Sequence, residues 1–191
     1  TVPVKQYNVS AINVEITLNQ WLDFYPGYMY VLDEDIDKVR AEETKNKEAR
    51  DKEGFDPGAV IAGVQAQWIQ PLTIRANQGD CVKIKLSNKL EGGEDVSLHI
   101  HGSSMVVSAT GAAATTANSD AIASKDKSAD LEWYIHPSLQ EGVRQFHTYS
   151  NDRELTVMGM FGSFVVEPKG STYWEPLGTG DATPATSGWQ V

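Results

Sequence analysis

The stretch Cys81-Val-Lys-Ile-Lys-Leu-Ser-Asn88 decides the fold class, because apolar and polar side chains alternate along it. A period of two puts Val82, Ile84 and Leu86 on one face, as in a strand with one buried side. The same alternation recurs in five further runs: 12–18, 96–101, 131–136, 143–149 and 161–167. Turn sequences with glycine separate several of these runs. The pattern predicts an all-β domain, built as an antiparallel sandwich or a barrel.

Composition and charge narrow the classes of function. The 191 residues are 40% hydrophobic and 22% charged, which suits a globular domain with a real core. A formal charge of -10 argues against a nucleic-acid surface, because such a surface needs clustered cations. No run of 18 apolar residues predicts a membrane span. The single cysteine, Cys81, excludes an internal disulfide and any CxxC metal site.

Three segments depart from the strand pattern. Residues 33–56 hold ten acidic and six basic side chains, which favours a solvated surface helix or a mobile loop over an acidic patch that gathers metal ions. Residues 108–124 are rich in Ala, Ser, Thr and Gly, which is typical of a long surface loop. We therefore expect one domain over residues 1–170, with insertions at 33–58 and 108–130, and an exit linker over 171–191.

Two of the four histidines lie in Leu98-His-Ile-His-Gly102. On a strand, His99 and His101 share one face with their Cα atoms about 7 Å apart, while Leu98 and Ile100 point to the core. Two partly exposed histidines on the wet face of a sheet would explain an isolated HxH equally well. Such a pair can also serve one metal ion or two adjacent ions, and imidazole suits copper, zinc, iron and nickel.

A third histidine strengthens the metal interpretation. The alternation in 143–149 puts His147 on the same face as Tyr149, so three imidazoles converge if this strand lies beside the first. We expect His136, which precedes a proline, to be an exposed turn residue rather than a ligand. No histidine lies within 17 residues of Cys81, which favours an inert, partly buried thiol over a copper thiolate.

The order of several motifs resembles the first domain of multicopper oxidases, over roughly residues 5–191. Residues 69–88 are similar to the segment that leads into their first copper-binding strand, and 98–102 to their first HxH motif. Residues 145–149, followed by 158–168, resemble their second histidine motif and closing strand. Residues 187–190 are similar to the exit from a first domain in large bacterial members, some of which oxidise manganese.

The resemblance implies a cupredoxin fold, which is a Greek-key β-barrel. It also implies a trinuclear copper cluster between two cupredoxin domains, where O2 is reduced to water. By position, His99 matches the ligand of the type 2 copper, and His101 and His147 match ligands of the type 3 pair. The implied partners are further cupredoxin domains or subunits of the same oxidase, and the implied location is extracytoplasmic.

The sequence departs from the family pattern at Tyr149, which holds the slot of a type 3 histidine. A protonated phenol is a poor copper ligand, so this part of the site is altered, incomplete or completed from elsewhere. The type 1 copper motif, a cysteine flanked by histidines with a downstream methionine, is absent from this chain. The chain is therefore expected to reduce O2 only as part of a larger polypeptide or complex.

Two functions follow from these observations. The first is an oxidase domain that lends three histidines to a shared cluster, with Mn(II), Fe(II) or a phenol oxidised elsewhere; the acidic segment 33–56 would attract a cation. The second is a scaffold module without catalysis, because a cupredoxin barrel does not fix function. A cupin-like metal barrel is a weaker third hypothesis, because its usual His-x-His and Glu spacing is not recognisable here.

Overall fold

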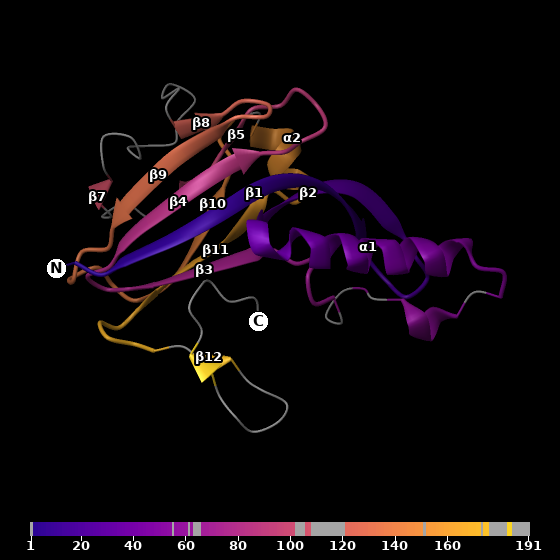
Figure 1. Ribbon diagram of the computed structural model, residues 1–191, viewed down its shortest axis with the longest axis horizontal. Helices are drawn as coiled ribbons and strands as arrows, with labels where there is room; N and C mark the ends of the chain where they lie inside the picture. The colour runs from indigo at the N-terminus through magenta and orange to yellow at the C-terminus, as the bar shows by residue number, and fades with distance from the viewer. Residues whose placement is uncertain are drawn as a thin grey trace.

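Two β-sheets enclose one apolar core in the computed structural model (Figure 1). It describes residues 2–54, 56–60, 62, 66–101, 106–107, 121–150, 152–172, 174–175 and 183–184. Side chains from both sheets fill the core, including Val9, Ile84, Leu131, Phe146 and Phe164. This arrangement confirms the predicted all-β class, because the alternating strands bury one face each between the sheets.

The first sheet has five strands in the order β2-β1-β4-β9-β7. Their bounds are β1 Val4–Thr17, β2 Phe24–Leu32, β4 Cys81–Asn88, β7 Val106–Val107 and β9 Ser128–Tyr134. Strand β1 runs antiparallel to β2 and parallel to β4, and β9 runs antiparallel to β4. The predicted run at 12–18 is thus the second half of a longer strand, which ends at Thr17, and the last residue of the run, Leu18, is exposed.

The second sheet carries two of the sequence-predicted histidines on neighbouring strands. Its order is β3-β11-β10-β6, with bounds β3 Leu72–Asn77, β6 His99–Ile100, β10 Gly142–His147 and β11 Phe161–Glu167. Strand β10 lies antiparallel between β11 and β6. The predicted run at 96–101 is not continuous: it breaks at Leu98 into β5 (Val96–Ser97) and β6, because β5 pairs with β8 (Ile122–Ala123) and β6 with β10.

The remaining elements are short, apart from one helix. They are η1 Asp33–Asp35, α1 Ile36–Asp51, η2 Pro57–Ala59, α2 Asp152–Val157, and the paired strands β12 Trp174–Glu175 and β13 Thr183–Pro184. Of the predicted loop at 108–124, residues 108–120 lie outside the described residues, and its end forms β8. Within the described ranges, no helix has the length and apolar character needed to cross a membrane.

The charged segment folds as the predicted helix, yet it is not simply solvated. Helix α1 lies along β1 and β2 (Figure 1), and Glu42, Glu43 and Asn46 on it are buried. The Glu42 carboxylate accepts hydrogen bonds from three consecutive backbone N–H groups, at residues 67–69, over 3.0–3.2 Å. Polar contacts, rather than an apolar stripe alone, therefore hold α1 on the sheet.

Candidate metal centre

The pairing of β6 with β10 brings the predicted histidines together. In this ladder His99 lies opposite His147, and the backbone N–H of His101 donates to the carbonyl of Gln145 over 2.8 Å. The ring centroids of His101 and His147 are 4.5 Å apart, and those of His99 and His101 are 5.2 Å apart. The three imidazoles therefore converge, as the strand alternation predicts.

The ring nitrogens show how two of these imidazoles face each other. Nδ1 of His147 donates to the carbonyl oxygen of Thr148 over 2.7 Å, which in a neutral ring leaves the lone pair on Nε2. That Nε2 lies 2.5 Å from Nε2 of His101. Two imidazole lone pairs that meet repel each other unless a proton or a cation lies between them. At this separation the pair shares one proton, which a metal ion bound to both nitrogens would have to displace.

The third imidazole is partly buried beside them. Burial lowers the pKa of His99, and the neighbouring His101 and His147 lower it further. His99 is therefore neutral at pH 7, which is the form that binds metal ions. The Tyr149 ring meets His99 edge to face with centroids 4.4 Å apart and lies 4.9 Å from His147. The Tyr149 ring thus packs beside the cluster, against His99 and His147.

The donor set fits copper only in part. Imidazoles are suitable ligands for copper, and these three stand on or directly beside strands that hold them in place. However, no group of three or more His, Cys, Asp or Glu side chains in the described part of the chain is arranged to hold a metal ion. The three imidazoles therefore do not form a complete metal site by themselves within the described residues.

A buried group of hydroxyls next to the cluster was missed in the sequence. Unbroken alternation along 96–101 would put Ser97 on the same outer face as His99, but its side chain is buried because the segment after His147 covers it. Ser97 Oγ accepts the N–H of Tyr149, and Thr148 Oγ1 accepts the N–H of Ser97. The break at Leu98 is the reason for the error, because face alternation holds only along a continuous strand.

The fourth histidine and the cysteine lie apart from this cluster. His136 is exposed after β9, where its Nδ1 contacts Ser138 Oγ at 2.6 Å and accepts the Ser138 N–H at 3.1 Å. The Cys81 thiol donates to Glu132 over 3.2 Å. Burial and the Glu132 carboxylate raise the pKa of Cys81, which keeps the sulfur protonated and weakens it as a ligand.

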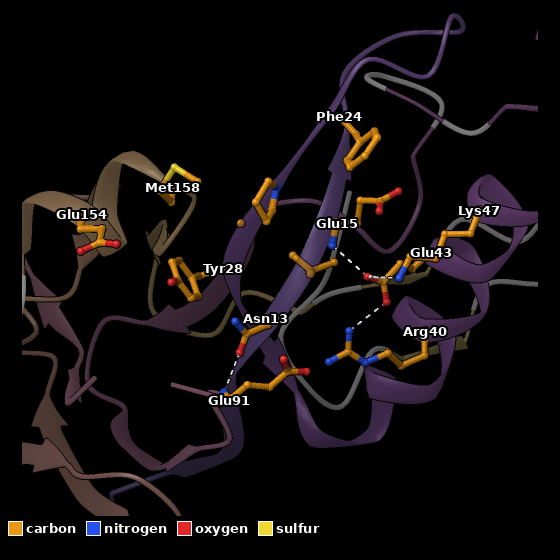
Figure 2. A pocket seen from close by; sticks show the side chains of 13 residues that line it. Asn13, Glu15, Phe24, Tyr28, Arg40, Glu43, Lys47, Glu91, Glu154 and Met158 are labelled. Carbon is orange, nitrogen blue, oxygen red and sulfur yellow. Dashed lines mark hydrogen bonds and ion pairs between the residues drawn. The ribbon is translucent and has the colours of Figure 1, made fainter. Parts of the chain in front are cut away.

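A groove of about 700 Å³ runs between helix α1, strands β1 and β2, and the end of α2 (Figure 2). The Glu43 carboxylate in its wall accepts the N–H of Glu15 and pairs with Arg40 and Lys47. Glu154 lines the other side. The basic side chains Arg40 and Lys47 are thus paired with Glu43 in the same wall of the groove. We interpret this wall as a structural contact rather than a ligand site.

Comparisons with known proteins give both a sequence-family match and structures of similar fold. A family model for multicopper oxidases matches residues 48–171. A multi-copper oxidase from Pseudomonas thermotolerans matches 90% of this chain and 31% of its own, at 14% identity and a TM-score of 0.56. A metallo-oxidase of the multicopper type from Campylobacter jejuni matches 87% and 26%, at 14% identity and 0.53. No curated protein sequence matches the chain.

A copper nitrite reductase from Nitrosomonas europaea also matches, over 87% of this chain and 42% of its own, at 14% identity and a TM-score of 0.52. The chain spans less than half the length of each of these structures. These likenesses confirm the predicted cupredoxin-like β fold. The family model covers well over half of the residues, and the chain therefore belongs to the multicopper oxidase family.

Proposed function

We propose that this cupredoxin domain contributes His99, His101 and His147 to a copper cluster that it shares with another cupredoxin domain or subunit. At that cluster O2 is reduced to water, while the reducing substrate is oxidised elsewhere in the assembly. The observation that carries the proposal is the convergence of three imidazoles from two adjacent strand segments. Three imidazoles do not complete a copper cluster alone, so the proposal requires further ligands from a second domain.

The residues of this chain would hold and orient copper. His147 is fixed in one tautomer by the carbonyl of Thr148, so its Nε2 faces the centre of the cluster. His99 is neutral at pH 7, so no proton has to be displaced from it. When bound, copper supplies the one-electron redox chemistry that imidazoles lack. Partner domains fit the length comparison, because the matched structures are more than twice as long as this chain.

The identity of the reducing substrate is a separate part of the proposal. Mn(II), Fe(II) and phenols all fit a cluster that receives its electrons from elsewhere, in an extracytoplasmic protein. Several carboxylates of the segment 33–56 are already engaged: Asp35 pairs with Lys38, and Glu42 accepts backbone N–H groups. A cation would then be attracted by the net charge of -10 rather than bound by these side chains.

Copper titration followed by electron paramagnetic resonance tests the proposal. The purified protein, with its partner domains where they are required, should bind copper at micromolar concentrations and show a Cu(II) signal. The double variant His99→Ala/His101→Ala should lose that signal, whereas the matched variant His136→Ala should keep it. Copper uptake that is equal in the double variant and the natural protein would contradict the assignment of these ligands.

A second candidate function is a scaffold module without catalysis. It is favoured by Tyr149, whose phenol stands where the family has a type 3 histidine and packs against His99. The oxidase activity of the complete assembly separates the two functions. Activity that is unchanged in the double histidine variant would favour the scaffold, and activity that is lost would favour the shared cluster.

A further inference from the structure

We propose that Ser97 is a positioning residue which, together with Thr148, sets the orientation of the histidine cluster. This inference rests on the proposed copper function. Ser97 lies two residues before His99, and only 1% of it is exposed. Its Oγ accepts the backbone N–H of Tyr149 over 2.8 Å and that of Ser150 over 3.3 Å. One hydroxyl thus ties the strand that carries His99 to the segment that follows His147.

Thr148 extends this link to an imidazole ring. Its fully buried Oγ1 accepts the N–H of Ser97 and donates to the carbonyl of Ser150, both over 3.1 Å. The carbonyl of the same residue accepts Nδ1–H of His147. A shift of Thr148 therefore turns the His147 ring and changes where its Nε2 points. The connection runs from Ser97 through Thr148 to the ligand nitrogen.

A third hydroxyl anchors this network in the other sheet. Tyr30 of β2 is fully buried, and its OH donates to the carbonyl of Ser97 over 2.5 Å. Its ring packs edge to face against Phe146 on β10, with centroids 5.5 Å apart. Because burial raises the pKa of Tyr30, its phenol remains a donor at neutral pH. Ser97 is therefore held from both sheets of the domain.

Few backbone hydrogen bonds hold the strand that carries His99, so the side-chain hydrogen bonds of Ser97 and Thr148 contribute to its position. Strand β6 is two residues long, and its ladder with β10 consists of the pairs His99–His147 and Ile100–Phe146. The chain leaves β5 at Ser97 and enters β6 at His99. A buried hydroxyl at this break supplies contacts that a continuous ladder would otherwise provide.

Ser97→Ala tests the inference against a matched control. The variant leaves the N–H groups of Tyr149 and Ser150 without their acceptor, and copper affinity should fall by about 10- to 100-fold, as is typical when a partner that orients a ligand is lost. Ser10→Ala removes another fully buried serine hydroxyl, which lies on β1 and donates to Asp33 of η1. It should keep the natural copper affinity and Cu(II) spectrum, and Ser97→Thr should restore most of the affinity.

A second pair of variants covers a failure of Ser97→Ala to fold, which circular dichroism would reveal. Thr148→Val keeps the shape of the side chain without the hydroxyl, and Thr148→Ser keeps the hydroxyl. Copper affinity should fall in the first and stay within a few-fold of the natural value in the second. All measurements use the same copper titration and electron paramagnetic resonance as above.

The possible results separate this inference from the proposed function. Weaker copper binding in Ser97→Ala and Thr148→Val, with normal binding in Ser10→Ala, supports the positioning role. Natural affinity and an unchanged spectrum in both folded variants overturn it while the copper function stands. An equal loss in Ser10→Ala also overturns it, because the effect would then be general destabilisation. A natural protein that takes up no copper overturns the proposed function itself, and the inference with it.

Discussion

Two polar regions of this domain differ in how their groups are paired. Where α1 meets β1, each charged group that we describe has a complementary partner: Arg50 forms a two-pronged contact with Glu15, and Glu43 pairs with Arg40 and Lys47. In the histidine cluster, groups of one kind face one another, and two imidazole nitrogens approach to 2.5 Å. The charged groups of the first region are neutralised by one another, whereas the imidazoles of the second face groups of their own kind.

This difference is a practical criterion for function. Complementary pairs lower the free energy of the folded chain, and they need no further component. Imidazoles that converge gain at most a shared proton and ring contacts from one another, and such an arrangement marks a candidate ligand site. On this criterion the helix contact is structural and the histidine cluster is the proposed binding site. Substitutions in the two regions should therefore affect different measurements.

The largest effect is expected for His101→Ala. Copper affinity should fall more than ~100-fold, because the loss of a ligand exceeds the 10- to 100-fold cost of losing a residue that orients one. The free energy of unfolding without copper should fall by about 1 kcal/mol, since the variant loses one hydrogen bond, to Nε2 of His147. Copper titration and urea unfolding measure the two quantities. A large loss of stability with intact copper binding would reverse the comparison.

Glu42→Ala should produce the opposite pattern. Only 4% of this residue is exposed, and its removal leaves three backbone N–H groups without their acceptor. We expect the free energy of unfolding to drop by about 2–4 kcal/mol, the usual range for losing buried hydrogen bonds to a charged group. Copper affinity should stay the same. Glu48→Ala, on the same helix, is the control for helix composition, and a similar loss there would contradict the role of Glu42.

The sequence predicts the strand elements better than the long-range polar contacts. Alternation alone predicted β4 and β11 at the residues observed, because each is a continuous strand with one buried face. It also predicted that His99 and His147 converge if their strands are neighbours, and the pairing of β6 with β10 supplies that condition. The burial of Glu42 could not be predicted, because its partners at 67–69 are 25 to 27 positions away and are backbone groups that carry no sequence signal.

The same reasoning explains the partial success at the site. The histidines are recognisable because their residue type and spacing already suggest metal ligation. Ser97 is not recognisable, because a serine between apolar residues is typical of an exposed strand position. Its burial depends on the break at Leu98 and on the segment 148–150 that covers it. Residues that orient ligands therefore become visible only when the strands are assembled.

Acid should weaken the helix contact through Glu43. Burial raises the pKa of this carboxyl, but the hydrogen bonds from Glu15 N–H, Arg40 and Lys47 outweigh burial and lower it below its ordinary 4.5. A carboxyl with a lowered folded-state pKa stabilises the protein above its unfolded pKa, and this contribution is lost as the pH falls through the folded value. Stability attributable to Glu43 should therefore be complete at pH 7 and disappear below about pH 4.5.

Glu43→Gln measures this contribution. At pH 7 the variant should be less stable by about 1–2 kcal/mol, because a neutral amide makes weaker hydrogen bonds to Arg40 and Lys47. The difference between the natural protein and the variant should shrink as the pH falls below 4.5, which urea unfolding at a series of pH values would record. A difference that is constant from pH 7 to pH 3 would show that ionisation of Glu43 plays no part.

The smallest effect is expected for His136→Ala, which tests whether a histidine outside the cluster contributes to copper binding. This imidazole is exposed, and its Nδ1 is occupied by the N–H and hydroxyl of Ser138 in its own turn. Like the charged groups between α1 and β1, this imidazole already has complementary hydrogen-bond partners, whereas the Nε2 atoms of His101 and His147 in the cluster face each other. Copper affinity should not change, and the free energy of unfolding should fall by about 0.5–1 kcal/mol for one lost hydrogen bond. A loss of copper in this variant would mean that complementary pairing fails to separate structural groups from ligands.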